Sequence, residues 1–128
     1  MTEGAPNCTF CKIAAGELPA ERLFETESYL CIADRYPVTE GHALLMPKAH
    51  VEELTAADWG SLTAGLDRAI ETVRSRTDPD ALNVGINDGT AAGQTIPHLH
   101  WHIIPRYEGD VANPAGGVRG VIPENQQY

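Results

Sequence analysis

Residues 98–104 read HLHWHII, so three of the chain's five histidines alternate with apolar residues within one short segment. Side chains two positions apart in a β-strand lie on the same face of the sheet. A strand here puts His98, His100 and His102 on one face and turns the apolar residues between them toward a core. The segment therefore predicts a row of imidazoles on a strand whose opposite face is buried.

The sequence around this segment predicts five strands and two helices. Apolar runs bounded by Gly and Pro predict strands over residues 22–26, 28–34, 42–47, 82–88 and 98–105. A short helical segment is expected over residues 9–17, with Gly16 ending it. Three strands, a long helix and two more strands suit a five-stranded antiparallel sheet with the helix on one face, which is an α+β fold.

The long helix has the clearest periodicity in the chain. Thr55 and Asp58 form a capping-box-like start. Apolar residues then recur at the spacing of one helix face: Trp59, Leu62, Leu66, Ile70 and Val73. We expect this stripe to face the core and to serve packing only.

Length and charge limit the classes of function. A chain of 128 residues is most simply one domain with its own core. Its formal net charge of −9, from 18 acidic and 9 basic residues, argues against general binding to nucleic acid or anionic membranes. No segment is apolar enough to span a bilayer, and the first ten residues do not resemble a secretory signal. Three cysteines are too few for a disulfide framework, so a cytoplasmic protein is expected.

Three interpretations of the histidine row compete. The side chains could be unrelated surface histidines, although regular alternation argues against chance. They could bind a catalytic zinc ion that keeps one position open for water. They could also support covalent catalysis at phosphorus, because imidazole, with a pKa of about 6.5, is largely neutral and nucleophilic at pH 7. The sequence offers no obvious carboxylate base beside the row, which favours the covalent interpretation.

The loop before the row, residues 87–97 (NDGTAAGQTIP), has features of a phosphate-binding loop. Gly89 and Gly93 permit tight turns and close approach of the backbone to a ligand. Gln94 and Thr95 add side-chain and amide donors. Such a loop means little by itself, but beside three histidines it predicts a substrate-binding segment that includes Gly93.

Cys8 and Cys11 form a C-x-x-C pair near the N-terminus. Such a pair is either a redox pair or half of a zinc site that two histidines would complete. His50 follows a predicted strand and is a candidate ligand. Cys31 alternates with apolar residues and is expected to be a buried core thiol.

Together these segments resemble the histidine-triad superfamily of nucleotide hydrolases and transferases. The resemblance rests on residues 8–20 (CTFCKIAAGELPA), 32–50 (IADRYPVTEGHALLMPKAH) and 87–107 (NDGTAAGQTIPHLHWHIIPRY). It implies the HIT-like form of the α+β fold, with residues 1–107 as the catalytic domain. Residues 108–128 would then be a Gly- and Pro-rich C-terminal arm, either disordered or extended over a site or a partner subunit.

The resemblance also implies roles for individual residues. His100, the middle histidine, would be the nucleophile that takes up a nucleotidyl group, and His102 would contact the α-phosphate and assist the leaving group. His42 would support the triad from the neighbouring strand, and Asp34 would bind the ribose hydroxyls. Contacts to the phosphate or the leaving group would come from Asn87, Gln94 and Thr95.

The implied reaction is cleavage at the α-phosphate of a nucleoside 5′-phosphate derivative, with release of the nucleoside monophosphate. The substrate would be a dinucleoside polyphosphate or a nucleoside phosphoramidate. Two alternatives stay open at this point. One is a nucleotide-binding regulatory module without turnover, and the other is a zinc-dependent hydrolase that uses the triad as metal ligands.

The C-x-x-C start resembles a bacterial-type, zinc-containing branch of the superfamily. There zinc is structural, which maps here onto Cys8, Cys11, His50 and His98, so that His98 would belong to both the triad and the metal site. Four protein ligands leave no position open for substrate. Members are commonly homodimers, which implies a homodimer that binds a small nucleotide.

Two features depart from the pattern or have no assigned role. Trp101 is bulkier than the aliphatic residue common at its position, but it should face away from the row and change only core packing. Arg119, in the arm, is a candidate phosphate contact, and a solvated surface arginine is the alternative.

Overall fold

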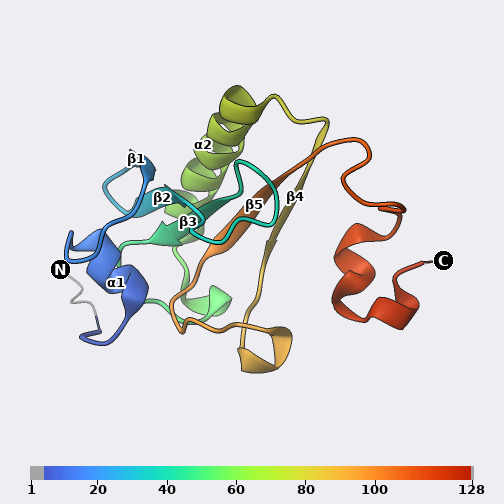
Figure 1. Cartoon of the computed structure of the whole chain (residues 1–128). Helices are drawn as coiled ribbons and strands as arrows, with labels where there is room; N and C mark the ends of the chain where they lie inside the picture. Colours follow the sequence, from blue (N-terminus) through green and yellow to red (C-terminus); the bar gives the residue numbers. More distant parts are fainter. Residues whose placement is uncertain (1–4, 128) are drawn as a thin grey trace.

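The sheet that carries the histidine row has five antiparallel strands in the order β1-β2-β3-β5-β4. A computed structural model gives this fold and describes residues 5–127 (Figure 1). In chain order the helices and strands are α1 (Thr9–Ala14), β1 (Arg22–Glu25), β2 (Tyr29–Ala33), β3 (Ala43–Pro47), α2 (Trp59–Thr77), β4 (Ala81–Ile86) and β5 (Trp101–Arg106). The predicted α+β class, with one long and one short helix, is confirmed.

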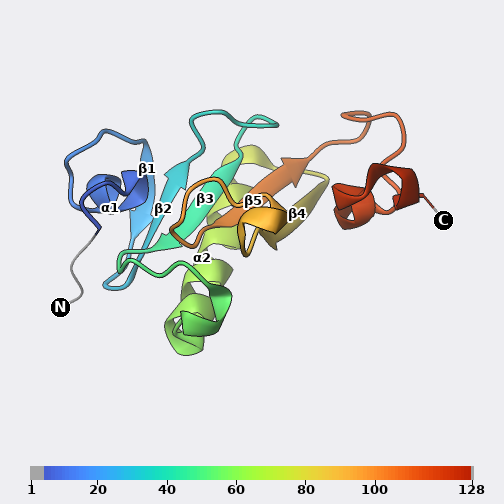
Figure 2. The same ribbon diagram turned by 90° about the horizontal axis from the view of Figure 1, so that it is seen from below.

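Two apolar layers bury β2 on both faces. Leu30 and Ile32 pack with residues of α1, whereas Tyr29 and Cys31 pack with residues of α2 on the opposite face. Burial on both faces explains why this strand reads as a continuous apolar run. Cys31 is the buried core thiol that its sequence context predicts, and burial raises its pKa to about 12. Figure 2 shows α2 lying against one side of the sheet.

The start of α2 differs from the capping-box prediction. Asp58 is itself the N-cap, and its carboxylate accepts hydrogen bonds from the N–H groups of Gly60 and Ser61. Thr55 instead lies in a 3-10 helix, η1 (Leu54–Ala56). Trp59 therefore occupies the first turn and is 56% exposed, so it does not belong to the core stripe. Within residues 5–127, no helix has the length and apolar content needed to cross a membrane.

The histidine strand begins later than predicted. Pairing of β5 with β3 starts only at Trp101, opposite Leu45, so His98 and His100 precede the regular strand. The backbone there makes other bonds, because the N–H of Leu99 donates to the carbonyl of Val51. The histidine side chains nevertheless lie on one side of this segment, because His98 and His100 both contact Phe10 and His100 contacts His102.

The C-terminal arm folds onto itself instead of running extended. It contains the 3-10 helices η3 (Gly117–Val121) and η4 (Pro123–Asn125). Arg119 donates to the backbone carbonyls of Asn125 and Gln126, which joins the two turns. Gly116 has a φ of +84°, and a Cβ at this position would overlap the Gln126 carbonyl oxygen, so the turn requires glycine. Figure 1 shows the arm standing beside β4, on the side away from α1.

Candidate active site and metal centre

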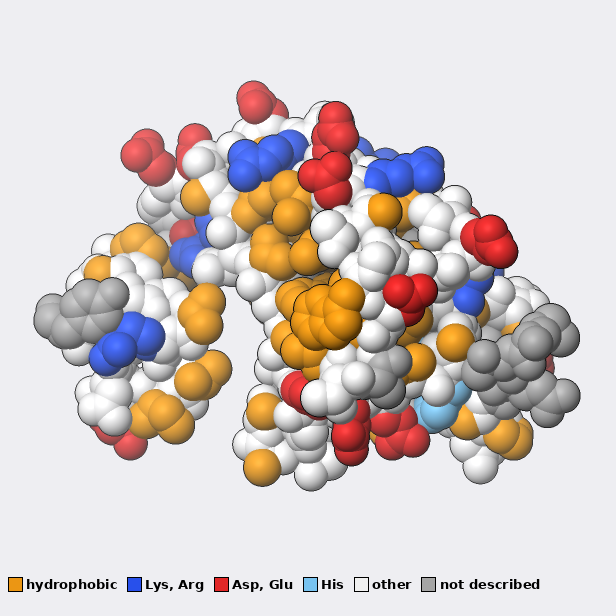
Figure 3. Space-filling view, turned by 180° about the vertical axis from the view of Figure 1, so that it is seen from behind, with side chains coloured by type: hydrophobic (Ala, Val, Ile, Leu, Met, Phe, Trp, Pro, Cys, Tyr) orange, Lys and Arg blue, Asp and Glu red, His pale blue; other side chains and the backbone are white. Residues whose placement is uncertain are grey.

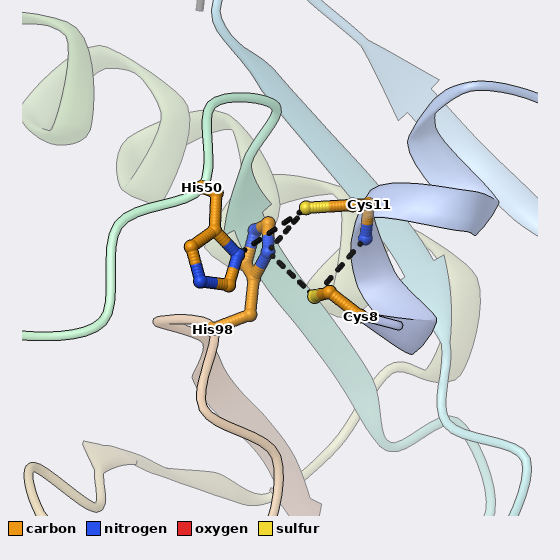
Figure 4. Close-up of side chains that lie close together, drawn as sticks. All are labelled: Cys8, Cys11, His50 and His98. Carbon is orange, nitrogen blue, oxygen red and sulfur yellow. Dashed lines mark hydrogen bonds between the residues drawn. The ribbon is translucent and has the colours of Figure 1, made fainter. Parts of the chain in front are cut away.

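Four side chains converge where α1 meets the segment before β5 (Figure 4). The sulfur atoms of Cys8 and Cys11 lie 3.2 Å and 3.4 Å from Nδ1 of His98, and the Cys11 sulfur lies 3.3 Å from Nδ1 of His50. All four donor atoms lie within 4.8 Å of one another. Sulfur and nitrogen ligands of one tetrahedral zinc ion are about 3.5 Å apart, so the spacing fits that ion.

The other nitrogen of each imidazole in this group also has a partner. His98 donates from Nε2 to the Pro47 carbonyl at 2.7 Å, and Nε2 of His50 lies 3.2 Å from the Glu52 carboxylate. These bonds leave the Nδ1 lone pairs directed at the two thiols, as in zinc sites whose histidines are fixed by outer hydrogen bonds. Burial lowers the pKa of His98, which favours the neutral imidazole that a metal requires. The residues therefore fit a structural zinc site.

The C-x-x-C pair is positioned by the first turn of α1. Cys8 is the N-cap of this helix, and its sulfur accepts a hydrogen bond from the N–H of Cys11 at 3.4 Å. Both cysteines are buried, and both are free thiols. The short helix therefore presents two sulfur atoms in one direction, toward the end of the histidine row.

His100 lies between the two ends of the row, and one of its ring nitrogens has no hydrogen-bond partner among residues 5–127. Its Nδ1 donates to the carbonyl of His98 at 2.8 Å, so the neutral ring carries its proton there and has a lone pair at Nε2. The ring is packed edge-to-face against Phe10, with centroids 4.9 Å apart. The nitrogen suited to nucleophilic attack is therefore Nε2, on a ring held by both a hydrogen bond and packing.

His42 and His102 form a hydrogen-bonded pair beside His100. The Val38 N–H donates to Nδ1 of His42 at 3.1 Å, and Nε2 of His42 lies 2.9 Å from Nδ1 of His102. The ring centroid of His102 is 5.2 Å from that of His100. Burial is the main cause that lowers the pKa of both paired histidines, and Asp34 partly opposes this shift. The pair is therefore held in its neutral form.

Asp34 lies at the edge of this pair. Its Oδ2 is 3.4 Å from Nε2 of His42, and its Oδ1 accepts the N–H of Tyr36 at 2.9 Å. Donor atoms of Asp34, His42 and His102 lie within 4.8 Å of one another, a second group that could hold a metal. His100 belongs to neither group, so the described residues do not bring the three triad histidines to one common ion.

The loop over residues 87–97 divides the predicted substrate contacts between two cavities. Asn87 lines a cavity of about 810 Å³ together with His42 and His102. Gln94 and Thr95 instead line a cavity of about 350 Å³ beside Glu52. The structure therefore groups only Asn87 with the histidine pair.

Within this loop the Gln94 amide closes the turn. Its Oε1 accepts the Gly89 N–H at 2.8 Å, and its Nε2 donates to the Glu52 carbonyl at 3.2 Å. Gly89 and Gly93 have φ values of +101° and +99°, which favour glycine. A Cβ on Gly93 would lie 3.9 Å from the Asn87 side chain, so Gly93 is a neighbour of the larger cavity.

The larger cavity lies between β4, β5 and the C-terminal arm. Figure 3 shows a deep hollow that separates the arm from the body of the molecule, with apolar side chains on the arm's inner side. Val84, Ile104, Val118 and Val121 contribute apolar lining. Arg119 is exposed and donates to carbonyls of the arm itself, and a contact with phosphate stays a prediction.

Several groups that define the site gave little or no signal in the sequence. The Val38 N–H and the Pro47 carbonyl are backbone atoms, which the residue type does not reveal. Phe10 contacts both His98 and His100, a role for which the sequence carries no signal. Glu52 could have been identified, because a carboxylate two residues after a candidate histidine ligand is a natural outer partner.

Trp101 occupies the core face opposite the row, as predicted. It packs against the cluster between the sheet and α2. Its Nε1 is buried and has no hydrogen-bond partner among the described residues. An unpaired buried N–H costs about 1–3 kcal/mol of stability. The Trp101 ring is therefore packed in the core while its N–H group lacks a hydrogen bond within the described part of the chain.

Comparison with known proteins identifies the family of this chain. The family model of the HIT domain matches residues 15–109. An adenosine 5′-monophosphoramidase of Schizosaccharomyces pombe is 36% identical over 100 residues, covering 78% of this chain and 74% of the relative. An adenylylsulfatase of Arabidopsis thaliana is 39% identical over 107 residues, covering 81% of this chain and 54% of that longer protein.

A solved structure adds a metal to the comparison. A zinc-bound histidine triad family protein from Mycobacterium smegmatis is 38% identical and has a TM-score of 0.75, with 86% of this chain and 82% of that chain covered. The family match spans most of the chain, and the likeness extends to the fold. This chain is therefore a member of the HIT family, whose members bind or hydrolyse nucleotides.

Proposed function

We propose that this protein hydrolyses the bond between the α-phosphate of a nucleoside 5′-phosphate and its leaving group, through a nucleotidyl-histidine intermediate. The observation that carries the proposal is the His100 imidazole, whose Nδ1 donates to the His98 carbonyl while Nε2 has no partner in the part of the chain that the structure describes. A neutral imidazole with a fixed ring and a free lone pair is suited to nucleophilic attack. Two relatives named for related hydrolyses support the reaction class.

The reaction proceeds in two displacements. Nε2 of His100 attacks the α-phosphorus, the phosphorus–leaving group bond breaks, and the leaving group departs with the electron pair. An amine leaving group takes up a proton from water as it departs. Water then attacks the same phosphorus and gives up one proton to the solvent. The phosphorus–nitrogen bond to His100 breaks, its electron pair returns to Nε2, and the nucleoside monophosphate is released. In both steps the Nε2–H group of His102 donates a hydrogen bond to a non-bridging oxygen of the α-phosphate, which stabilises the negative charge that develops on this oxygen.

AMP release from three substrates tests this proposal. Adenosine 5′-phosphoramidate, diadenosine tetraphosphate and adenylyl sulfate differ only in the leaving group. We expect wild type to convert at least one, and the preferred substrate identifies the leaving-group class. His100→Asn should be inactive, and Asp67→Ala, which removes a carboxylate on the exposed side of α2, should retain full activity.

Two results would contradict the covalent mechanism. Full turnover by His100→Asn would mean that another group is the nucleophile. Absence of turnover by wild type, with tight binding of AMP in calorimetry, would favour the alternative of a nucleotide-binding regulatory module.

We also propose that the Cys8, Cys11, His50 and His98 group binds a structural zinc ion. The donor spacing and the outer hydrogen bonds support this choice. Zinc bound by these four residues would cross-link α1 to the segment before β5. Chelation is then expected to lower thermal stability together with activity, whereas a catalytic zinc ion would be lost without unfolding.

A homodimer and a cytoplasmic location complete the proposal. β4 is at the edge of the described sheet, and its neighbour is the hollow beneath the arm, which offers apolar lining. A free strand edge beside an apolar surface is suited to a second subunit. Free buried thiols suit a reducing compartment. Light scattering at several protein concentrations tests the dimer, and cell fractionation tests the location.

A further inference from the structure

The proton on His42 can be assigned from its neighbours. A backbone N–H can only donate, so the Val38 bond favours an acceptor at Nδ1 of His42 and a proton of the neutral ring on Nε2. That proton faces Nδ1 of His102 at 2.9 Å and Oδ2 of Asp34 at 3.4 Å. A carboxylate beside an N–H stabilises the form that carries the proton there.

His102 takes its own tautomer from His42. Because Nδ1 of His102 accepts, its neutral ring carries the proton on Nε2, which has no protein partner within residues 5–127. A proton on this nitrogen makes it a donor for a phosphate oxygen, whereas the opposite tautomer presents a lone pair that repels the oxygen. The titratable groups that face His102 are His42, His100 and Asp34.

The Asp34 side chain is partly buried and is held in place by a backbone hydrogen bond. Its side chain is only 15% exposed, and the Tyr36 N–H holds Oδ1, which directs Oδ2 toward His42. We propose that Asp34 is a positioning residue: through His42, it keeps His102 in the tautomer that donates to the α-phosphate. This role is separate from a contact with the ribose, and it rests on the proposed function.

A pair of substrates separates the two roles. Adenosine 5′-phosphoramidate and its 2′,3′-dideoxy analogue differ only in the ribose hydroxyls. If Asp34 acts through His42, Asp34→Ala lowers kcat by at least about tenfold for both substrates. If Asp34 only binds ribose, the loss appears with the first substrate and disappears with the analogue, which would overturn the proposal.

Two further variants sharpen this measurement. Asp34→Asn has one acceptor oxygen and cannot serve both the Tyr36 N–H and His42, so its kcat should fall between those of wild type and Asp34→Ala. In a His42→Asn background, Asp34→Ala should cause no further loss of kcat with the dideoxy analogue. A full additional loss would show that Asp34 acts by another route. Asp67→Ala controls for the change in net charge.

Imidazole ¹H–¹⁵N NMR of the free protein gives a readout that does not depend on turnover. We expect His42 and His102 to carry their protons on Nε2 in wild type, and His102 to become a mixture of tautomers in Asp34→Ala. Unchanged tautomers in this variant would overturn the proposal. If wild type converts neither substrate, the proposed function fails, while the NMR result still decides whether Asp34 controls the tautomer.

Discussion

The two ends of the histidine row differ in what their second ring nitrogen contacts. His98 is fully buried, donates from Nε2 to the Pro47 carbonyl and directs Nδ1 at two thiols. His102 accepts at Nδ1 from His42, and its Nε2 has no partner in the described part of the chain. Residues of one type on one face can therefore hold structure together at one end and remain available for chemistry at the other.

His100 connects these two ends. Its ring is oriented by the backbone carbonyl of His98, so a residue of the proposed zinc site also fixes the proposed nucleophile. The comparison therefore predicts that damage at the metal end reduces both stability and activity. Damage at the chemical end should reduce activity alone.

The largest effect is expected for His100→Asn. Removing a nucleophile typically costs several orders of magnitude, so we expect AMP release to fall by at least about 10³-fold. The free energy of unfolding should stay within about 1 kcal/mol of wild type, because the Asn amide can replace the donation of His100 Nδ1 to the His98 carbonyl. Steady-state kinetics and urea unfolding measure the two quantities. A large loss of stability in this variant would contradict the prediction that changes at the chemical end of the histidine row reduce activity alone.

The next largest effect is expected for Cys11→Ser, at the metal end. Loss of one of four ligands should release zinc and lower the free energy of unfolding by several kcal/mol. Metal content by mass spectrometry and urea unfolding check this result. In excess chelator, wild type and the variant should have the same stability. A difference of several kcal/mol that persists there would mean that the cysteine acts by packing and not through metal.

The stability of the protein should also fall with acidification. Burial lowers the pKa of His98, His42 and His102 in the folded state, so the unfolded chain binds more protons near pH 6. Stability is therefore complete above about pH 6.5 and declines as the pH falls toward the folded pKa values. Each proton taken up on unfolding contributes about 1.4 kcal/mol per pH unit. Urea unfolding between pH 5 and pH 8 measures the slope, and His42→Asn should reduce it.

A smaller effect is expected for Glu52→Gln. This change removes the carboxylate that contacts Nε2 of His50, which is an outer partner of the metal centre. Loss of such a partner typically weakens metal binding about tenfold or more. Competition with a chromophoric zinc chelator measures the affinity. Unchanged affinity would mean that His50 is held by its own backbone, and Glu53→Gln serves as the matched control.

The smallest effect is expected on the opposite face, at Trp101. Trp101→Phe removes the buried Nε1–H that has no partner among the described residues, and it also removes some packing. The gain of about 1–3 kcal/mol and the loss from the smaller ring should nearly cancel. We expect the free energy of unfolding to change by about 1 kcal/mol or less. A much larger loss would show that Nε1 has a partner in solution.

The sequence was sufficient to predict the fold class and the approximate strand positions. Alternation in residues 98–104 and continuous apolar runs at β2 and β3 depend on burial, which is a local property of each strand. The start of β5 was predicted three residues too early, because strand pairing depends on a neighbour, and β3 reaches β5 only at Trp101. The capping box was not predicted correctly, because Thr55 and Asp58 are both good caps and residue type alone does not decide between them; Thr55 lies in a 3-10 helix and Asp58 is the N-cap.

The candidate site was less accessible to prediction from sequence. Residue types indicated which histidines and cysteines could meet, and the structure places the four predicted metal ligands together. The tautomers were not predictable, because they depend on backbone atoms of Val38, Pro47 and His98. The sequence also did not predict that residues 87–97 contribute to two separate cavities. The Gln94 amide meets the Gly89 N–H and the Glu52 carbonyl only in the folded chain.

The segment between β2 and β3 has a consequence for evolution. The N–H groups of Tyr36 and Val38 hold Asp34 and His42, yet the two side chains are 79% and 68% exposed. Backbone amides persist through nearly every substitution, so the two hydrogen bonds should survive most changes of side chain, including at Val38, whose side chain lines the larger cavity. A library randomised at residues 36 and 38 should therefore keep activity in most variants and lose it with proline, which has no N–H to donate.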